Sequence, residues 1–267
     1  MTAIATENVR RRASVSHRVP LTRVTQVELR KMFNTRSGFW LIASIAISAV
    51  LATGGVILWA PDDQPTYSTF ATAIRFPVVV ILPLIAILAV TSEWSQRTGL
   101  TTFTLIPHRS RIITAKAISS VLIAIAAMVL TFAVGALGNL LSTAVTGTTL
   151  VWDVTLTQGV YYVLGMVLSL LIGFMLGVLI RSSTGAIVAY FILTFLLPTI
   201  FGLLATSQPW FHDLQPWIDI QFAQSGLFVF DQALTGEQWA NIAVTGVTWL
   251  LIPMALGLAF VMRAEVK

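Results

Sequence analysis

Residues 160–180 read VYYVLGMVLSLLIGFMLGVLI, an apolar run without a charged side chain. A bilayer core about 30 Å thick needs roughly 20 helical residues, because an α-helix rises about 1.5 Å per residue. The run therefore predicts a membrane-spanning helix. Five further runs have a similar length and character, and the whole set is 39–60, 74–92, 112–141, 160–180, 186–206 and 239–262. The predicted fold class is an all-α membrane protein with six transmembrane helices.

The composition supports this class. The chain is 56% hydrophobic and only 10% charged, whereas soluble domains carry about 25% charged residues. It has no cysteine, so disulfides, thiolate metal sites and cysteine nucleophiles are excluded. The net charge of +5 does not predict a nucleic-acid partner, because the basic residues sit beside apolar runs. Membrane lipid is the expected surrounding.

The distribution of lysine and arginine predicts the orientation. Fifteen of the sixteen lie in residues 1–38, in the connection between the second and third runs, in the link 181–185 or after residue 262. The positive-inside rule places these segments, and hence both termini, in the cytoplasm. Only Arg75 falls toward the other side. An even number of spans agrees with termini on one side, and residues 38–267 form one six-span domain.

A segment before the first span has helical amphipathicity. Residues 20–37 are predicted to form an interfacial helix on the inner membrane surface, after a mobile basic tail at 1–19. Arg30 lies on its polar side, whereas Glu28 falls inside the apolar arc. Glu28 has two interpretations: a local ion pair with Lys31, or a contact to a partner or to residues 92–116.

A second unusual segment precedes the last span. Residues 207–238 are predicted to be external, yet they are rich in tryptophan and phenylalanine. We expect short re-entrant or interfacial helices here. The alternative is an external cap that packs on the spans.

Small and polar residues inside the runs predict packing features. Asn139 lies toward the outer end of the third run, where it forms an interhelical hydrogen bond or contacts a substrate. Pro83 removes a hydrogen bond from the second span and kinks it, a possible element of a pathway. A stripe of small residues in the fourth span allows close helix approach, and its members are Gly165, Ser169, Gly173 and Gly177.

The chain lacks the common catalytic signatures. It contains no G-x-x-x-x-G-K-[ST], H-E-x-x-H or G-x-S-x-G pattern. Its three histidines fall in different topological regions, so they do not predict a metal site. The scarcity of charge in the spans argues against a proton-coupled carrier. We predict that the chain is not an enzyme and itself holds no cofactor or metal.

Residues 92–116, SEWSQRTGLTTFTLIPHRSRIITAK, form a charged connection between the second and third spans. They resemble a loop of the permease subunits of bacterial type-2 ATP-binding-cassette exporters, in which S-E-[aromatic]-x-x-x-T precedes a proline turn and a lysine. The matching residues are Ser92, Glu93, Trp94, Thr98, Pro107 and Lys116.

The resemblance implies a multi-pass subunit of a bacterial cell membrane. It implies that residues 93–111 form a coupling loop seated in separate ATPase subunits, which hold the ATP and magnesium, and that two permease copies pair as a homodimer or heterodimer. The residues it assigns to coupling are Glu93, Arg97, Thr98, Pro107, Arg109 and Arg111. The function implied is efflux of drugs, peptides, lipids or glycans. The alternative function is a non-transporting assembly, immunity or sensor subunit bound to an ATPase.

Overall fold

The computed structural model describes residues 20–60, 65–95, 109–147, 149–230 and 233–263. Within these ranges the chain is helical and contains no strand. Six helical stretches are long and apolar enough to cross a membrane. The predicted all-helical class and the six spans are therefore confirmed, and the chain is a multi-pass membrane protein. The predicted tail at 1–19 and most of the coupling loop, 96–108, lie outside the described residues.

Consecutive helices fill most of the described chain. The first part contains α2 (Leu21–Asn34), α3 (Arg36–Trp59), α4 (Tyr67–Ser95), α6 (Arg109–Thr146) and α7 (Leu156–Ile180). The fifth span consists of α8 (Ser183–Phe191), the π-helix η1 (Ile192–Leu196) and α9 (Leu197–Ser207). The segment predicted to be external, residues 207–238, is named the external segment after that prediction and contains α10 (Pro209–Ile218), α11 (Ile220–Ser225) and the 3-10 turn η2 (Gly226–Phe228). The last span contains α12 (Gly236–Gly246), the π-helix η3 (Val247–Leu251) and α13 (Ile252–Arg263).

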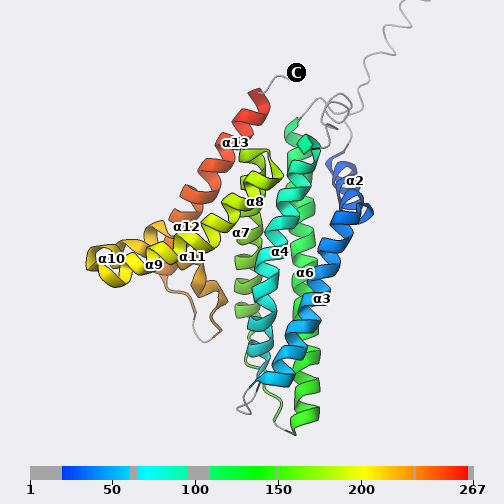
Figure 1. Ribbon diagram of the computed structural model, residues 1–267, viewed down its shortest axis with the longest axis vertical. Helices are drawn as coiled ribbons and strands as arrows, with labels where there is room; N and C mark the ends of the chain where they lie inside the picture. The colour runs from blue at the N-terminus through cyan, green and yellow to red at the C-terminus, as the bar shows by residue number, and fades with distance from the viewer. Residues whose placement is uncertain (1–19, 61–64, 96–108, 148, 231–232, 264–267) are drawn as a thin grey trace, which may run out of the picture.

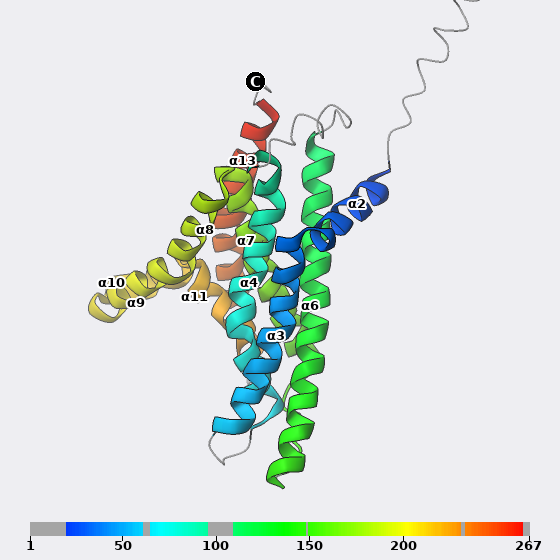
Figure 2. The ribbon, with the colours of Figure 1, turned by 45° about the vertical axis from the view of Figure 1, so that its right-hand side comes forward.

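Four long helices, α3, α4, α6 and α7, stand side by side and enclose the main core (Figure 1). Their facing side chains include Ile45, Leu82, Met128 and Phe174, all of them buried. In contrast, α2 runs obliquely to these four helices. It crosses the first part of α6 and ends where α3 begins (Figure 2). This placement agrees with the amphipathic pattern of α2, since Val24 is buried and Arg30 is exposed.

The second span begins at Tyr67, earlier than the hydropathy pattern suggests. Polar residues in its first turns lower the local hydropathy, so the apolar run in the sequence begins later than the helix. The loop before α7 caps this helix end, because both the backbone N–H and the hydroxyl of Ser68 donate to the Asp153 carboxylate, at 2.8 and 2.6 Å. Asp153 thereby satisfies a backbone donor that a helix start leaves without an intrahelical partner.

Asn139 holds a neighbouring part of the same loop. Its side-chain amide donates to the Val151 carbonyl at 2.9 Å. The residue therefore tethers the connection after α6 and makes no bond to another span. Both of these loop contacts lie at the end of the bundle away from α2 (Figure 1).

The closest helix contact joins α4 and α7, which begin at the same end of the bundle. A Cβ on Gly173 would lie only 2.6 Å from Pro83 Cβ and 2.8 Å from the Pro83 carbonyl oxygen. Nearer the α2 end, a Cβ on Gly177 would lie 3.3 Å from Val90 Cβ and 3.4 Å from the Ile87 backbone, which is also a tight contact. Two members of the small-residue stripe, Gly173 and Gly177, thus pack against α4 within this chain. Pro83 is buried in this contact against α7.

Four prolines remove backbone donors inside the described spans, Pro77, Pro83, Pro198 and Pro253. An additional donor or a π-turn is found beside the last three. Pro83 cannot bond the Val79 carbonyl four residues earlier; the Tyr190 hydroxyl of α8 donates to that oxygen at 2.7 Å. Pro198 and Pro253 each follow a π-helix, η1 and η3. In both, the residue before the proline donates its N–H five residues back, to Ile192 and to Val247.

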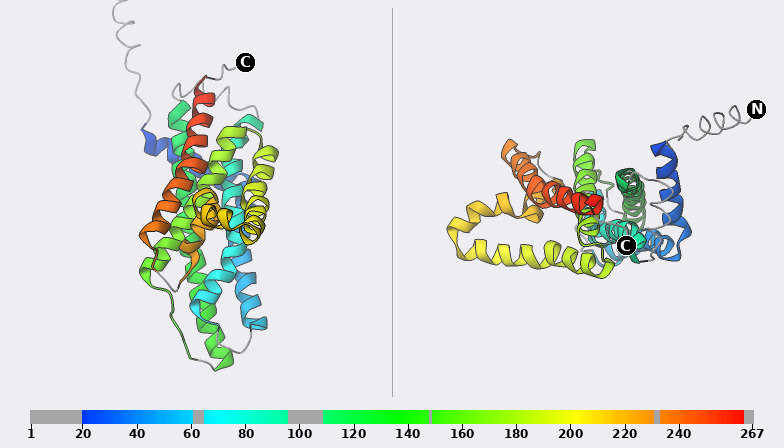
Figure 3. Two further views of the ribbon diagram at one scale, coloured as in Figure 1. Left: turned by 90° about the vertical axis from the view of Figure 1, so that its left-hand side faces the viewer. Right: turned by 90° about the horizontal axis from the view of Figure 1, so that it is seen from above.

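The fifth span leaves the bundle after a tight corner. Arg181 ends α7 in the left-handed conformation, with φ of 59°, and Ser182 caps α8 by accepting from the Gly185 N–H. From there α8, η1 and α9 run outward, and α10 and α11 fold back toward the bundle (Figure 3). The external segment is helical, as predicted.

The α4–α7 contact leads to a stability prediction. We expect Gly173→Ala to lower the free energy of unfolding by about 1–3 kcal/mol, because the added methyl would force the Pro83 backbone away. The matched control is Gly54→Ala in α3, where an added Cβ has no neighbour within 4 Å and alanine favours the helix. Thermal unfolding in detergent compares the two. Equal melting temperatures would contradict the close-contact account.

Candidate functional site

An ion-paired junction joins three helices beside the ends of the 93–111 loop. The Glu28 carboxylate of α2 accepts from Lys31 at 2.6 Å and from Lys116 of α6 at 2.7 Å. The Lys116 ammonium also donates to the Ala89 carbonyl of α4 at 2.9 Å. We call Glu28, Lys31, Lys116 and the Ala89 carbonyl the inner junction. It ties α2 to the last turns of α4 and the first turns of α6.

The core of the junction is closed to solvent. The side chains of Glu28 and Lys116 are each 6% exposed, whereas Lys31 is about half exposed. Next to them, the Ser119 hydroxyl of α6 donates to the Thr25 carbonyl of α2 at 3.2 Å. Thr25 and Glu28 therefore lie on the buried face of α2, which is otherwise apolar, because both make polar contacts to α6.

The local fold sets the angle at which α2 reaches the inner junction. Thr35 is extended, with φ of −86° and ψ of 137°, and breaks the helix between α2 and α3. Its hydroxyl accepts from the Gly38 N–H at 3.2 Å. A Cβ at Gly38 would collide with the Met32 carbonyl oxygen, so this corner requires glycine. The corner turns α2 across α6 and brings Glu28 to Lys116.

The junction holds Glu28 in its charged form. Burial raises the pKa of this carboxyl, but the attraction of Lys116 and the hydrogen bonds from Lys116 and Lys31 outweigh burial and leave the pKa below its ordinary value. A buried ion pair gains net stability only where its remaining hydrogen bonds are also made. Here both carboxylate oxygens have a lysine donor.

Both interpretations of Glu28 are found together, since it pairs locally with Lys31 and across helices with Lys116. The sequence pattern alone did not predict Lys116 as the partner of Glu28. One feature of the sequence did point to the pair, since Glu28 and Lys116 are both charged residues at positions where the surrounding helical pattern is apolar. Arg30, the other residue expected to make contacts from α2, is exposed.

Three of the six predicted coupling residues fall in described helix ends next to this junction. Glu93 falls in the last turn of α4, Arg109 opens α6, and Arg111 lies in the first turn of α6 with a partly exposed side chain. The side chains of Glu93 and Arg109 lie outside the described part, as do Arg97, Thr98 and Pro107 entirely. The structure therefore describes the two ends of the loop and the junction that holds them.

A second contact strengthens the α4 side of the loop. The hydroxyl of Thr91 donates to the Ile87 carbonyl at 2.8 Å and lies 2.7 Å from the hydroxyl of Ser183. Ser183 is the first residue of α8. The inner end of α4 is thus linked to the fifth span as well as to α2 and α6.

An aromatic cluster closes the opposite end of the bundle. Tyr162 of α7 stacks on Phe230 with ring centroids 5.6 Å apart and meets Phe228 edge-on at 5.5 Å. The Tyr162 hydroxyl donates to the Ala71 carbonyl at 2.8 Å. Gly165 leaves room for Phe228, because a Cβ there would lie 2.5 Å from the ring. The external segment therefore inserts side chains between α4 and α7.

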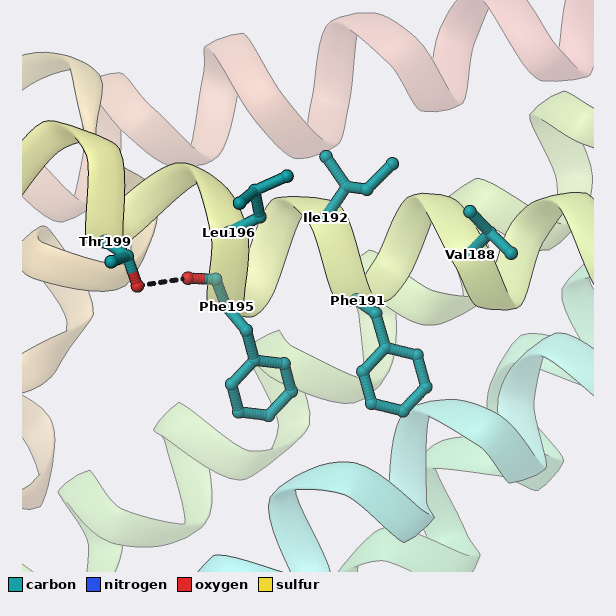
Figure 4. Close-up of a pocket in the computed structure, with 6 residues that line it drawn as sticks. All are labelled: Val188, Phe191, Ile192, Phe195, Leu196 and Thr199. Atoms are coloured by element: carbon teal, nitrogen blue, oxygen red, sulfur yellow. Dashed lines mark hydrogen bonds between the residues drawn. The ribbon is translucent and has the colours of Figure 1, made fainter.

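An apolar groove of about 470 Å³ runs along the fifth span. Figure 4 shows Val188, Ile192 and Leu196 on one side of the helix and Phe191 and Phe195 on the other. The sixth lining residue, Thr199, donates its hydroxyl to the Phe195 carbonyl at 2.6 Å. The groove has no free polar group suited to catalysis, and most of its side chains are exposed.

The comparisons with known proteins do not assign a family. No protein-family model matches this chain. No curated protein matches it significantly.

The inner junction predicts a strong effect of Glu28. We expect Glu28→Ala to lower the free energy of unfolding by about 3–5 kcal/mol, because it removes the carboxylate that compensates the charge of the buried Lys116 ammonium. The double variant Glu28→Ala with Lys116→Met should recover much of the loss. Arg30→Ala is the control on the same helix and should change stability by about 0.5 kcal/mol or less, because Arg30 is exposed. Thermal unfolding measures all three. Identical losses for the single and double variants would contradict the pairing.

The lowered pKa of Glu28 sets a pH window for the attachment of α2. The ion pairs of Glu28 stabilise this attachment fully above about pH 4.3, the pKa of a glutamate in an unfolded chain. This stabilisation is lost as the pH falls through the lower pKa that Glu28 has in the folded protein. We therefore expect the α2–α6 distance to be constant from about pH 8 to 5 and to increase only in stronger acid. Because the chain has no cysteine, spin labels on Val27→Cys and Ile118→Cys can report this distance. An increase already near pH 6 would contradict the account.

Proposed function

We propose that this chain is the membrane-spanning permease subunit of an ATP-driven exporter, with ATP hydrolysis on a separate partner chain. The observation that carries the proposal is the inner junction, because it connects the ends of the charged 93–111 loop to three helices. A partner that moves this loop would move α2, α4 and α6 together. The resemblance of the loop to those of type-2 exporter permeases supports the same conclusion.

The fold is suited to such movement. The Thr91–Ser183 hydroxyl contact passes a displacement of α4 to α8, and the π-turns at η1 and η3 interrupt the regular helix in the fifth and sixth spans. Helices commonly bend at π-bulges and prolines. We propose that the fifth and sixth spans change their tilt while the close α4–α7 contact stays intact, so that an inward opening becomes an outward one.

The proposed orientation puts both termini and the inner junction in the cytoplasm and the external segment outside. It rests on the bias of lysine and arginine toward the α2 end. In this orientation the aromatic cluster of Phe228, Phe230 and Tyr162 is the outer closure. The low burial of the fifth span, 11% of its apolar window, leaves a lateral surface for a second permease copy.

Coupling is tested by charge changes in the loop. In a complex with its ATPase partner, we expect Glu93→Ala or Arg97→Glu to reduce ATP hydrolysis and transport by about tenfold or more, because loss of one member of an interfacial charge pair costs about 2 kcal/mol or more. Arg36→Ala is the control, since Arg36 is exposed at the start of α3, outside the loop.

Two outcomes would overturn the proposal. One is normal assembly and normal ATP-dependent substrate movement in vesicles with both loop variants. The other is purification of the wild-type chain as a stable lone subunit that binds no P-loop ATPase. A complex that hydrolyses ATP but moves no substrate would instead favour the non-transporting alternative.

A further inference from the structure

Arg75 is a charged side chain inside a span, at the end of the bundle away from α2. It follows Tyr67, the first residue of α4, by eight residues, or about 12 Å along the helix. Its neighbour Ile74 is buried, whereas Phe76 is 72% exposed on the lateral surface. Arg75 itself is partly buried. It therefore lies at the border between the protein core and the lipid.

One face of the Arg75 guanidinium is occupied by an aromatic ring. Its Cζ lies 4.5 Å from the ring centroid of Phe228. Phe228 is fixed in turn by Tyr162 and by the space at Gly165. A cation–π contact fills a face of the guanidinium and leaves the N–H groups at its edge available.

No carboxylate among the described residues forms an ion pair with Arg75. Apart from Glu28 at the other end of the bundle, the described acids that are buried or half-buried are already engaged. Asp153 accepts from Ser68, and Asp219 accepts from Gln215 and two backbone N–H groups. An arginine is always charged in a protein. In a span, such a charge normally has a partner or reaches the interface.

We infer that Arg75, held on the Phe228 ring, binds the phosphate of a phospholipid in the leaflet away from α2. The guanidinium edge can donate two parallel hydrogen bonds to phosphate oxygens. The long side chain can extend toward the phosphate layer from its position about 12 Å along α4. This inference depends on the position of Arg75 in the bundle and not on the proposed transport function.

The consequence concerns the external segment. A phospholipid bound at Arg75 would lie beside Phe228, which η2 contributes to the contact with α7. The lipid would therefore stabilise the inserted position of Phe228 and Phe230. Loss of the phosphate would weaken this contact without affecting the inner junction at the other end of the bundle.

The test measures lipid binding to the purified chain in phosphate-free detergent. The probe is dioleoylphosphatidylglycerol, followed by native mass spectrometry and by its effect on the melting temperature, with dioleoylglycerol as the matched lipid that lacks phosphate. We expect wild type to retain the phospholipid and Arg75→Gln to bind it about fivefold more weakly, as one interfacial cation contributes about 1 kcal/mol. Arg75→Lys should keep part of the binding.

Two controls separate this site from other sources of binding. Arg36→Gln removes an exposed cation at the α2 end and should leave the Arg75-dependent retention unchanged. Phe228→Leu keeps the charge but removes the ring beneath it, and should also weaken retention. Both variants are compared with wild type by melting temperature without lipid, which identifies any loss of folding.

Three outcomes would overturn the inference. Equal phospholipid retention by wild type and a folded Arg75→Gln variant would show that Arg75 does not bind the phosphate. An equal rise in melting temperature with inorganic phosphate would assign the site to a free anion. A gain of phospholipid binding in Asp231→Asn would show that Arg75 is paired within the chain, to a residue outside the described part.

Discussion

The bilayer core offers no water to backbone N–H and C=O groups, and this constraint governs the whole molecule. Within its described residues the chain satisfies these groups with helices. Beside three of the four prolines in its described spans, another donor or a π-turn is found. The Tyr190 hydroxyl takes the place of the missing Pro83 N–H at the Val79 carbonyl, and π-turns precede Pro198 and Pro253. The irregularities of the spans are therefore consequences of backbone satisfaction.

The same constraint explains why helix packing depends on small residues. In lipid the hydrophobic effect between helices is weak, so close van der Waals contact drives association. Gly173 permits that contact by admitting the Pro83 ring and backbone. Proline supplies a backbone without a protruding N–H, and glycine supplies a surface without a side chain. Together they pack α4 closely against α7, and more exposed helices are arranged around this pair.

Two charged features lie toward opposite ends of this helix pair, and charge has a different role at each. At the inner junction, Glu28 and Lys116 neutralise one another across two helices. At the opposite end, Arg75 has an aromatic partner from the external segment. The first arrangement connects the proposed coupling loop to the bundle. The second lies where the proposed outer closure meets the membrane. Both depend on a helix corner or turn that delivers a side chain from a separate segment.

The class, the number of spans and the helical external segment could be predicted because each depends on local composition and length. The small-residue stripe was also visible, since its four-residue spacing places it on one helix face. The early start of α4 could not be predicted, because Ser68, Thr69 and Arg75 make its first turns polar. In addition, the group that caps this helix start at Ser68 is Asp153, which lies in a distant loop.

The sequence by itself determined what must be buried in lipid, because a bilayer imposes a length and an apolar surface on each helix. Only the tertiary structure decided which partners meet. Glu28 and Lys116 lie 88 positions apart, and no local pattern joins them. Their pairing requires the corner at Thr35, the crossing of α2 over α6 and the burial that makes two opposite charges dependent on one another.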